Sequence, residues 1–245
     1  MKYSAKIHAH RGASAYAPEN TLPAFKLAKE MNSDGIECDI HMTKDGVIVV
    51  CHDFQLDRTS NGKGNICDYN YDELLKYDFG VCHGDKFKGT HIPLLTEMLE
   101  IVKDMDPINI EIKDLGKNTN EEFDIFYTVL KQFNCIERVI ISCFDIDLIY
   151  RLKQRHPDLK TGFLFGGAEM AQKCVAFSKE HLCDAIHPYF GDMTPEIIAD
   201  AHANGLIVNA WTIDDEENIR RMLDYGCDGI ISNKPDLVRK ILSEE

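Results

Sequence analysis

Short apolar runs alternate with longer amphipathic segments from about residue 106 to the C-terminus. Apolar runs of about four to eight residues are typical of buried strands, and apolar positions three or four apart are typical of helices. The pattern predicts strands at 108–113, 139–144, 161–165, 185–190, 206–213 and 229–232, and helices near 120–133, 145–155, 169–180, 194–204, 215–225 and 235–243. Alternation of this kind favours a parallel sheet covered by helices.

The N-terminal part adds two strands, at 7–10 and 35–42, with a helix expected at 22–31 between them. The sequence therefore predicts eight strands, each followed by a helical or loop segment. Eight such units in 245 residues favour an α/β fold closed as a TIM (β/α)₈ barrel. An open doubly wound sheet is the alternative, because a strand count does not by itself establish closure.

One stretch, residues 54–93, breaks this alternation. It follows an extended run at 47–53, precedes a helix that begins near Leu94, and is rich in turn-forming sequences such as Asn61-Gly62 and Asp78-Phe79-Gly80. We interpret it as a small insertion after the second barrel strand, within a single domain that spans residues 1–245. Insertions at the carboxyl ends of barrel strands commonly shape the active site.

Two carboxylates interrupt the apolar strand predicted at 35–42. Glu37 and Asp39 are two residues apart, so both side chains should lie on one face of the strand. Glu111 lies on the next predicted barrel strand. Three converging carboxylates suit a hard divalent cation such as Mg²⁺, Ca²⁺ or Mn²⁺. The alternative is a buried ion-pair network in which Lys113 and Arg11 neutralise the carboxylates.

Further polar residues fall at the ends of predicted strands, where barrel active sites form. His10 and His52 are candidate proton carriers because an imidazole titrates near neutral pH, although a structural role is common for a histidine. Arg11 and Lys113 could hold anionic phosphate oxygens. Trp211, the single tryptophan, could pack in the core or form an apolar wall for a substrate.

Charge and cysteine content narrow the class of protein. A net charge of −14 argues against nucleic acid as a partner, which requires basic surfaces. The nine cysteines form no C-x-x-C pair and are odd in number, which favours a reducing, cytoplasmic location. No apolar run of membrane-spanning length or signal-peptide type is visible, so no integral membrane segment is expected. Homo-oligomerisation is compatible with the sequence and is not specified by it.

The motifs in order resemble the signature of the glycerophosphodiester phosphodiesterases, and the resemblance covers nearly the whole chain. The motifs that carry it are His10-Arg11-Gly12, Ala17-Pro18-Glu19-Asn20-Thr21 with Ala24-Phe25, Glu37-Cys38-Asp39, Thr43-Lys44-Asp45-Gly46, His52-Asp53, Leu56 with Arg58-Thr59, Ile92-Pro93 with Leu95 and Glu97, Asn109-Ile110-Glu111-Ile112-Lys113, Ser142-Cys143-Phe144, Ala210-Trp211-Thr212 and Asp228-Gly229-Ile230. One position departs from the family pattern: Ser232-Asn233 stand where Thr-Asp is common, and no role is assigned there.

The resemblance implies a metal-dependent hydrolase that cleaves small-molecule glycerophosphodiesters to glycerol 3-phosphate and an alcohol. It implies one divalent cation as cofactor. Carried over by position, the resemblance makes Glu37, Asp39 and Glu111 metal ligands, His10 and His52 the general acid and base, and Arg11 and Lys113 phosphate contacts.

Two other functions are compatible with these motifs. One is lysophospholipase D-type cleavage of lysophospholipids, and the other is a non-catalytic barrel that binds phosphodiesters. The sequence leaves open which histidine is the acid, and whether water or a substrate hydroxyl attacks first. It does not name the alcohol or the metal.

Overall fold

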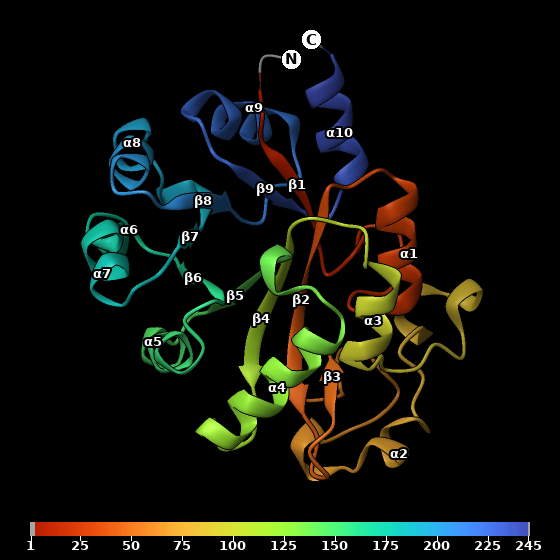
Figure 1. The fold of residues 1–245 in the computed structure, drawn as a ribbon. Helices are drawn as coiled ribbons and strands as arrows, with labels where there is room; N and C mark the ends of the chain where they lie inside the picture. The colour runs from red at the N-terminus through yellow and green to blue at the C-terminus, as the bar shows by residue number, and fades with distance from the viewer. Residues whose placement is uncertain (1–2, 245) are drawn as a thin grey trace.

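The computed structural model describes residues 3–244, and eight parallel strands in it close into a barrel (Figure 1). The ring order is β1-β9-β8-β7-β6-β5-β4-β2, and β1 also pairs with β2 to close it. The strands are β1 (Lys6–His10), β2 (Gly35–Met42), β4 (Ile108–Asp114), β5 (Val139–Cys143), β6 (Lys160–Phe165), β7 (Ala185–Pro188), β8 (Ile207–Ala210) and β9 (Gly229–Ser232). The closed ring confirms the predicted TIM barrel.

Helices surround the strands and bury their apolar faces against them. They are α1 (Leu22–Glu30), α3 (Leu95–Ile101), α4 (Asn120–Gln132), α5 (Ile146–Arg155), α6 (Ala168–Ala171), α7 (Cys174–Glu180), α8 (Pro195–Ala203), α9 (Glu216–Tyr225) and α10 (Pro235–Ser243). Local sequence sets several ends: the Asp145 side chain caps α5, and Gly226 ends α9 in a left-handed conformation. Between residues 3 and 244, no helix is both long enough and apolar enough to cross a bilayer.

The side chains of β2 alternate as the sequence predicts. Ile36, Cys38 and Ile40 are buried in the core between the strands and the helices. Glu37 and Asp39 therefore point into the barrel. In the register of β2 with β4, Asp39 lies opposite Glu111, which brings two of the predicted carboxylates side by side.

The centre of the barrel holds a polar layer where barrels usually hold branched apolar side chains. The buried His187 ring contacts Asn109 at Nδ1 (3.4 Å) and Asn209 at Nε2 (3.1 Å). Two glycines leave room for this layer. A Cβ atom at Gly162 would lie 2.7 Å from the Nε2 atom of His187, and one at Gly229 would lie 2.3 Å from the Oδ1 atom of Asn209.

Most predicted elements differ from the structure by a residue at an end, and three differ by more. β7 ends at Pro188 rather than at residue 190, because a 3₁₀ turn follows at Phe190–Asp192. β8 spans only Ile207–Ala210, and beyond it Trp211 forms a single bridge to Tyr189. The helix predicted at 169–180 is divided: α6 ends at Ala171, and α7 begins at Cys174 with Lys173 as its N-cap residue.

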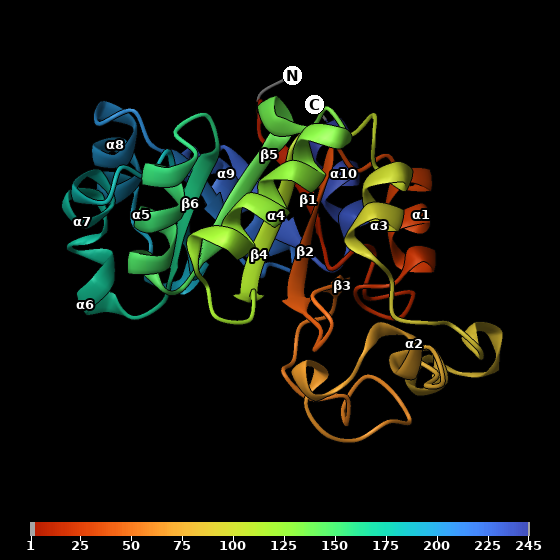
Figure 2. The ribbon, with the colours of Figure 1, turned by 60° about the horizontal axis from the view of Figure 1, so that its bottom comes forward.

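Residues 54–93 stand beyond the end of the barrel to which the arrowheads of β2 and β4 point (Figure 2). They follow β3 (Ile48–Val50), which pairs antiparallel with the end of β2. This segment contains short helical turns that the sequence did not predict: η1 (Ile66–Asp68), α2 (Tyr71–Leu74), η2 (Val81–His83) and η3 (Asp85–Phe87). A separate small apolar cluster, which includes Leu56, Ile66 and Phe79, supports it.

All nine cysteine thiols are free. Seven of them are buried. Burial raises the pKa of the Cys51 thiol, for example, to about 12. Cys67 and Cys82 are exposed, and both belong to segment 54–93.

Candidate active site

A cavity opens at the carboxyl ends of the strands, on the side of segment 54–93. Seven of the eight predicted site residues line it: His10, Arg11, Glu37, His52, Glu111, Lys113 and Trp211. The eighth, Asp39, is fully buried, and its Oδ1 atom lies 3.3 Å from the Lys113 Nζ atom. The structure therefore brings together all the side chains that the sequence singled out.

The three carboxylates crowd one another in a buried place. Glu37, Asp39 and Glu111 can each direct an oxygen to within 4.8 Å of the other two. Burial, together with repulsion between the carboxylates, raises the pKa of Glu37 well above its usual range and that of Glu111 to about 7. Burial alone would also raise the pKa of Asp39, but Lys113 and Arg11 hold it below its ordinary value.

The donor set fits a divalent cation. The buried Oδ1 atom of Asp39 accepts no hydrogen bond, and the Lys113 Nζ atom at 3.3 Å is the cationic group beside it, so the oxygen has room for a further ligand contact. Lys113 forms an ion pair with Glu111, and the Arg11 Nε atom lies 3.5 Å from Asp39. These are the contacts expected of an ion-pair network, but with all three carboxylates ionised the two cationic side chains would leave one negative charge unbalanced. All the donors are oxygens, as Mg²⁺, Ca²⁺ and Mn²⁺ prefer.

His10 is held by an amide from the far end of the chain. Its Nδ1 atom lies 2.7 Å from the Oδ1 atom of Asn233. The Asn233 backbone N–H and Nδ2 both donate to Asp214, so its side-chain oxygen faces the ring. An amide oxygen only accepts, so the hydrogen is on Nδ1 and the Nε2 atom is free, 3.8 Å from Glu37. Burial, with Arg11 nearby, lowers the pKa of His10 to about 4.

His52 has a parallel arrangement with a carboxylate in place of the amide. Its Nδ1 atom lies 2.6 Å from the Oδ1 atom of Asp53, so Nδ1 carries the hydrogen and Nε2 is left free. Asp53 in turn accepts two hydrogen bonds from Arg58. Burial lowers the pKa of His52, and the negative charge of Asp39 partly opposes that effect.

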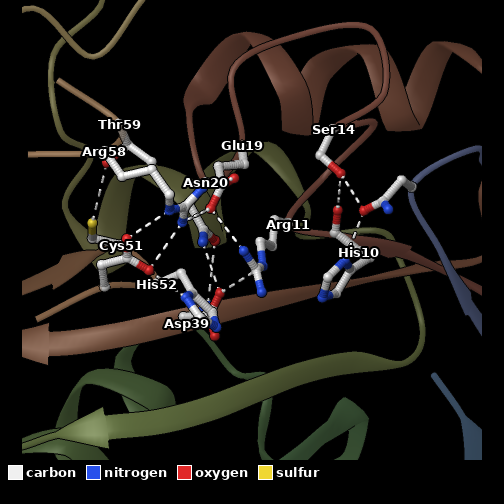
Figure 3. Close-up of polar contacts among 12 residues, drawn as sticks. His10, Arg11, Ser14, Glu19, Asn20, Asp39, Cys51, His52, Arg58 and Thr59 are labelled. Atoms are coloured by element: carbon white, nitrogen blue, oxygen red, sulfur yellow. Dashed lines mark hydrogen bonds and ion pairs between the residues drawn. The ribbon is translucent and has the colours of Figure 1, made fainter. Parts of the chain in front are cut away.

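Arg11 is fixed by the tight loop after β1 (Figure 3). Its backbone N–H donates to Glu37 (3.0 Å), and its Nη1 atom donates to Glu19 (2.8 Å). Asn20, from the same loop, donates to the Oδ2 atom of Asp39 at 2.7 Å. Gly12 allows the loop to approach α1 closely, since it has φ of +80° and a Cβ atom there would lie 2.6 Å from the backbone of Ala24.

One wall of the cavity is aromatic. The Trp211 Nε1 atom donates to the backbone oxygen of His187 at 2.7 Å, and the Phe144 ring meets the Trp211 ring edge to face at 5.7 Å. Trp211 is thus anchored in the barrel and also lines the cavity. Phe144 is half-exposed at the rim.

Sequence reasoning missed the residues that orient the predicted ones. Glu19, Asn20, Asp53 and Arg58 belong to the quoted motifs, but their side chains were given no role, and Asn233 was noted only as a departure from a family pattern. A signal existed for the three charged residues among them, Glu19, Asp53 and Arg58, because charged side chains fall in short turns next to candidate site residues.

Comparison with known proteins decides the family. The model of the glycerophosphoryl diester phosphodiesterase family matches residues 10–237. The chain belongs to this family. Membership confirms the predicted resemblance and the predicted enzyme class, a phosphoric diester hydrolase.

Relatives match over almost the full length of the chain. A glycerophosphodiester phosphodiesterase of Caldanaerobacter subterraneus subsp. tengcongensis is 40% identical, with 96% of this chain and 98% of that protein covered. One from Bacillus altitudinis is 32% identical, with 98% of each covered. Among solved structures, an Oleispira antarctica phosphodiesterase in complex with the product sn-glycerol-3-phosphate superposes with a TM-score of 0.89, at 27% identity, covering 98% of this chain and 97% of that one.

Proposed function

We propose that this enzyme hydrolyses glycerophosphodiesters to glycerol 3-phosphate and an alcohol, with a divalent cation and two histidines. The observation that carries the proposal is the single cavity at which three buried carboxylates, two imidazoles with free Nε2 atoms, and two cationic side chains meet. The product bound in the Oleispira relative supports glycerol 3-phosphate as the product here.

Glu37, Asp39 and Glu111 would hold the cation, which when bound supplies a Lewis acid for a phosphoryl oxygen. The chain itself supplies the charges that receive the phosphodiester. Arg11 and Lys113 line the cavity and would bind the anionic phosphoryl oxygens, where they offset the charge that develops in the transition state.

The two histidines would move the protons. One free Nε2 atom takes a proton from the attacking hydroxyl as the new P–O bond forms. The other, protonated beforehand, gives its proton to the departing alkoxide as the old P–O bond breaks. His10 and His52 each have Nδ1–H held by a fixed acceptor, so each presents Nε2. Each transfer contributes a factor of about 10² to 10⁴.

Two adjoining spaces suit the two arms of a phosphodiester. The cavity with Phe144 and Trp211 is the more enclosed, and an open polar groove along segment 54–93 shares His52 and Lys113 with it. We place the glycerol arm in the enclosed cavity and the variable alcohol in the groove. An acyl chain on the glycerol has less room there, which favours water-soluble glycerophosphodiesters over lysophospholipids.

The test is an assay of released glycerol 3-phosphate with glycerophosphocholine and glycerophosphoethanolamine. Chelator-treated enzyme is expected to lose activity and to regain it with Mg²⁺, Ca²⁺ or Mn²⁺. Full activity in chelator would contradict the metal. Faster turnover of a lysophospholipid than of its deacylated counterpart would favour the lysophospholipase D-type function. Tight binding without turnover across all metals would favour a non-catalytic binding barrel.

Two further proposals concern the chain as a whole. We retain the division into a single domain, residues 1–245, with an insertion at 54–93, which has its own small apolar cluster. We also retain the cytoplasmic location, which nine free thiols support because a reducing compartment keeps thiols unpaired.

A further inference from the structure

A side chain from segment 54–93 lies between two parts of the site (Figure 3). Arg58 donates from Nη1 and Nη2 to the two carboxylate oxygens of Glu19, at 2.7 and 2.8 Å. It also donates from Nε and Nη2 to the two oxygens of Asp53, at 2.6 and 3.0 Å. One guanidinium therefore holds two carboxylates, each through a pair of hydrogen bonds.

Each carboxylate also contacts a residue that lines the cavity. The Oε1 atom of Glu19 accepts from the Nη1 atom of Arg11 at 2.8 Å. The Oδ1 atom of Asp53 lies 2.6 Å from the Nδ1 atom of His52. The result is a continuous chain of contacts, Arg11–Glu19–Arg58–Asp53–His52, in which two carboxylates alternate with two guanidinium groups and an imidazole. Arg11, at one end of this chain, also lies 3.5 Å from the buried Asp39.

The position of Arg58 in this chain explains why a guanidinium is needed. Without it, Glu19 and Asp53 would be two neighbouring carboxylates that repel each other, and each would be free to turn away from its second partner. A lysine cannot replace it fully, since an ammonium is a point charge and cannot form paired hydrogen bonds with two carboxylates. Hydrogen bonds from Arg58, and then from His52, stabilise the ionised form of Asp53 and hold its pKa far below the ordinary value.

We propose that Arg58 is a positioning residue for phosphodiester hydrolysis. Through Glu19 it holds Arg11 in a fixed orientation, and through Asp53 it holds His52 in a fixed orientation. Segment 54–93 then completes the site without touching the reacting phosphorus, while Arg58 also borders the groove in which we place the alcohol. This inference rests on the proposed function for its kinetic consequences and on the hydrogen-bond geometry alone for the orientation of His52.

The kinetic test compares R58M and R58K with R155M. Arg155 is a matched control because it forms a paired ion bridge with Asp124, at 2.9 and 2.7 Å, away from the cavity. Its side chain is 46% exposed, against 49% for Arg58. With glycerophosphocholine we expect R58M to lower kcat and raise KM, and to lose about 10²-fold in kcat/KM. R58K should recover part of this, and R155M should stay within about twofold of wild type.

Chemical rescue separates positioning from a general loss of stability. Low concentrations of guanidinium should restore part of the activity of R58A and none in R155A, since only the first leaves a vacancy between Glu19 and Asp53. An R58M variant within about threefold of R155M in kcat/KM would overturn the proposal, as would R58A without rescue.

A measurement without substrate tests the positioning role of Arg58 separately from the proposed function. Nitrogen NMR of the His52 ring should show the Nδ1-protonated tautomer in the wild type and in R155M, and a mixture of tautomers in R58M. If the wild-type enzyme turned over no glycerophosphodiester, the proposed function would fail while this experiment still tested Arg58. An unchanged His52 tautomer in R58M would overturn the role of Arg58 whatever the activity.

Discussion

At the residue scale, the site consists of side chains held by a second set of side chains. His10 is oriented by Asn233 and His52 by Asp53, and in both rings the hydrogen is on Nδ1. The free Nε2 atoms are the chemically useful ones. This makes the two rings the groups whose removal should affect turnover most without affecting folding.

We expect His10→Ala and His52→Ala each to lower turnover of glycerophosphocholine by a factor of about 10² to 10⁴, because each removes one proton carrier. Circular dichroism should show an intact fold. His91→Ala is the matched control, since His91 is exposed on segment 54–93 and lines neither space at the site. A near-normal rate in either of the first two variants would remove that histidine from the mechanism.

At the three carboxylates, we expect one substitution to maintain or raise the stability of the metal-free protein and to weaken metal binding. Glu111→Gln removes one of three crowded anions and leaves two carboxylates for Arg11 and Lys113. We expect the metal-free variant to melt at the same temperature as wild type or higher, because burial and repulsion by Asp39, which together raise the pKa of Glu111 to about 7, no longer oppose a charged side chain at this position. The increase in melting temperature on adding Mn²⁺ should shrink.

Differential scanning fluorimetry with and without Mn²⁺ checks this expectation. Glu100→Gln, at an exposed ion pair on α3, is the control and should leave the response to Mn²⁺ unchanged. A Glu111→Gln variant with the full Mn²⁺ response would show that Glu111 does not hold the ion.

At the scale of elements, the sequence predicted those features that repeat every few residues, such as the alternation of side chains along a strand. Alternation along β2 was readable because successive side chains of a strand face opposite sides, so Glu37 and Asp39 could be assigned to one face. The partners of these residues were not readable, because they come from distant parts of the chain. Asn233 is 223 positions from His10, and only closure of the barrel brings them together.

Strand and helix ends were less predictable for a related reason. The apolar pattern continues past Pro188, where β7 ends, and through Lys173, which separates α6 from α7, so hydrophobicity alone does not mark these ends. Segment 54–93 was recognised by its turns, but its short helical turns depend on a local apolar cluster that has no regular spacing. Arg58 was therefore visible as a motif residue and not as the link that the structure reveals.

Strand β6 gives a prediction at this scale. Gly162→Ala would bring a Cβ atom to 2.7 Å from the His187 Nε2 atom, so the polar layer would have to shift. We expect a loss of about 1–3 kcal/mol in the free energy of unfolding, measured by urea denaturation. Gly166→Ala is the control, since its Cβ atom would lie no closer than 3.5 Å to its nearest neighbour. Equal stability of the two variants would contradict the tight packing described.

At the scale of the whole molecule, the polar centre of the barrel should make stability depend on pH. Burial lowers the pKa of His8 to about 4 and that of His187 to about 3, so both rings are neutral in the folded protein. In the unfolded chain they titrate near 6.5. Below that pH the unfolded state binds more protons, so the folded state loses stability as the pH falls.

We expect the free energy of unfolding to fall by several kcal/mol between pH 7 and pH 4, since one unit of pKa difference corresponds to about 1.4 kcal/mol. Urea denaturation at each pH measures this. His187→Gln should flatten the dependence, and His91→Gln, at an exposed position, should leave it unchanged. A His187→Gln variant with the wild-type slope would place the pH dependence elsewhere.

The distribution of thiols has a practical consequence. Cys67 and Cys82 are the exposed ones, so a maleimide dye should attach to segment 54–93 and leave the seven buried thiols unmodified in the folded enzyme. With Cys82→Ser, a single dye at Cys67 would face one natural fluorescence donor, since Trp211 is the only tryptophan. Energy transfer from Trp211 to the dye would show whether segment 54–93 moves relative to the site during turnover. No substitution in the barrel strands or helices is needed for this measurement.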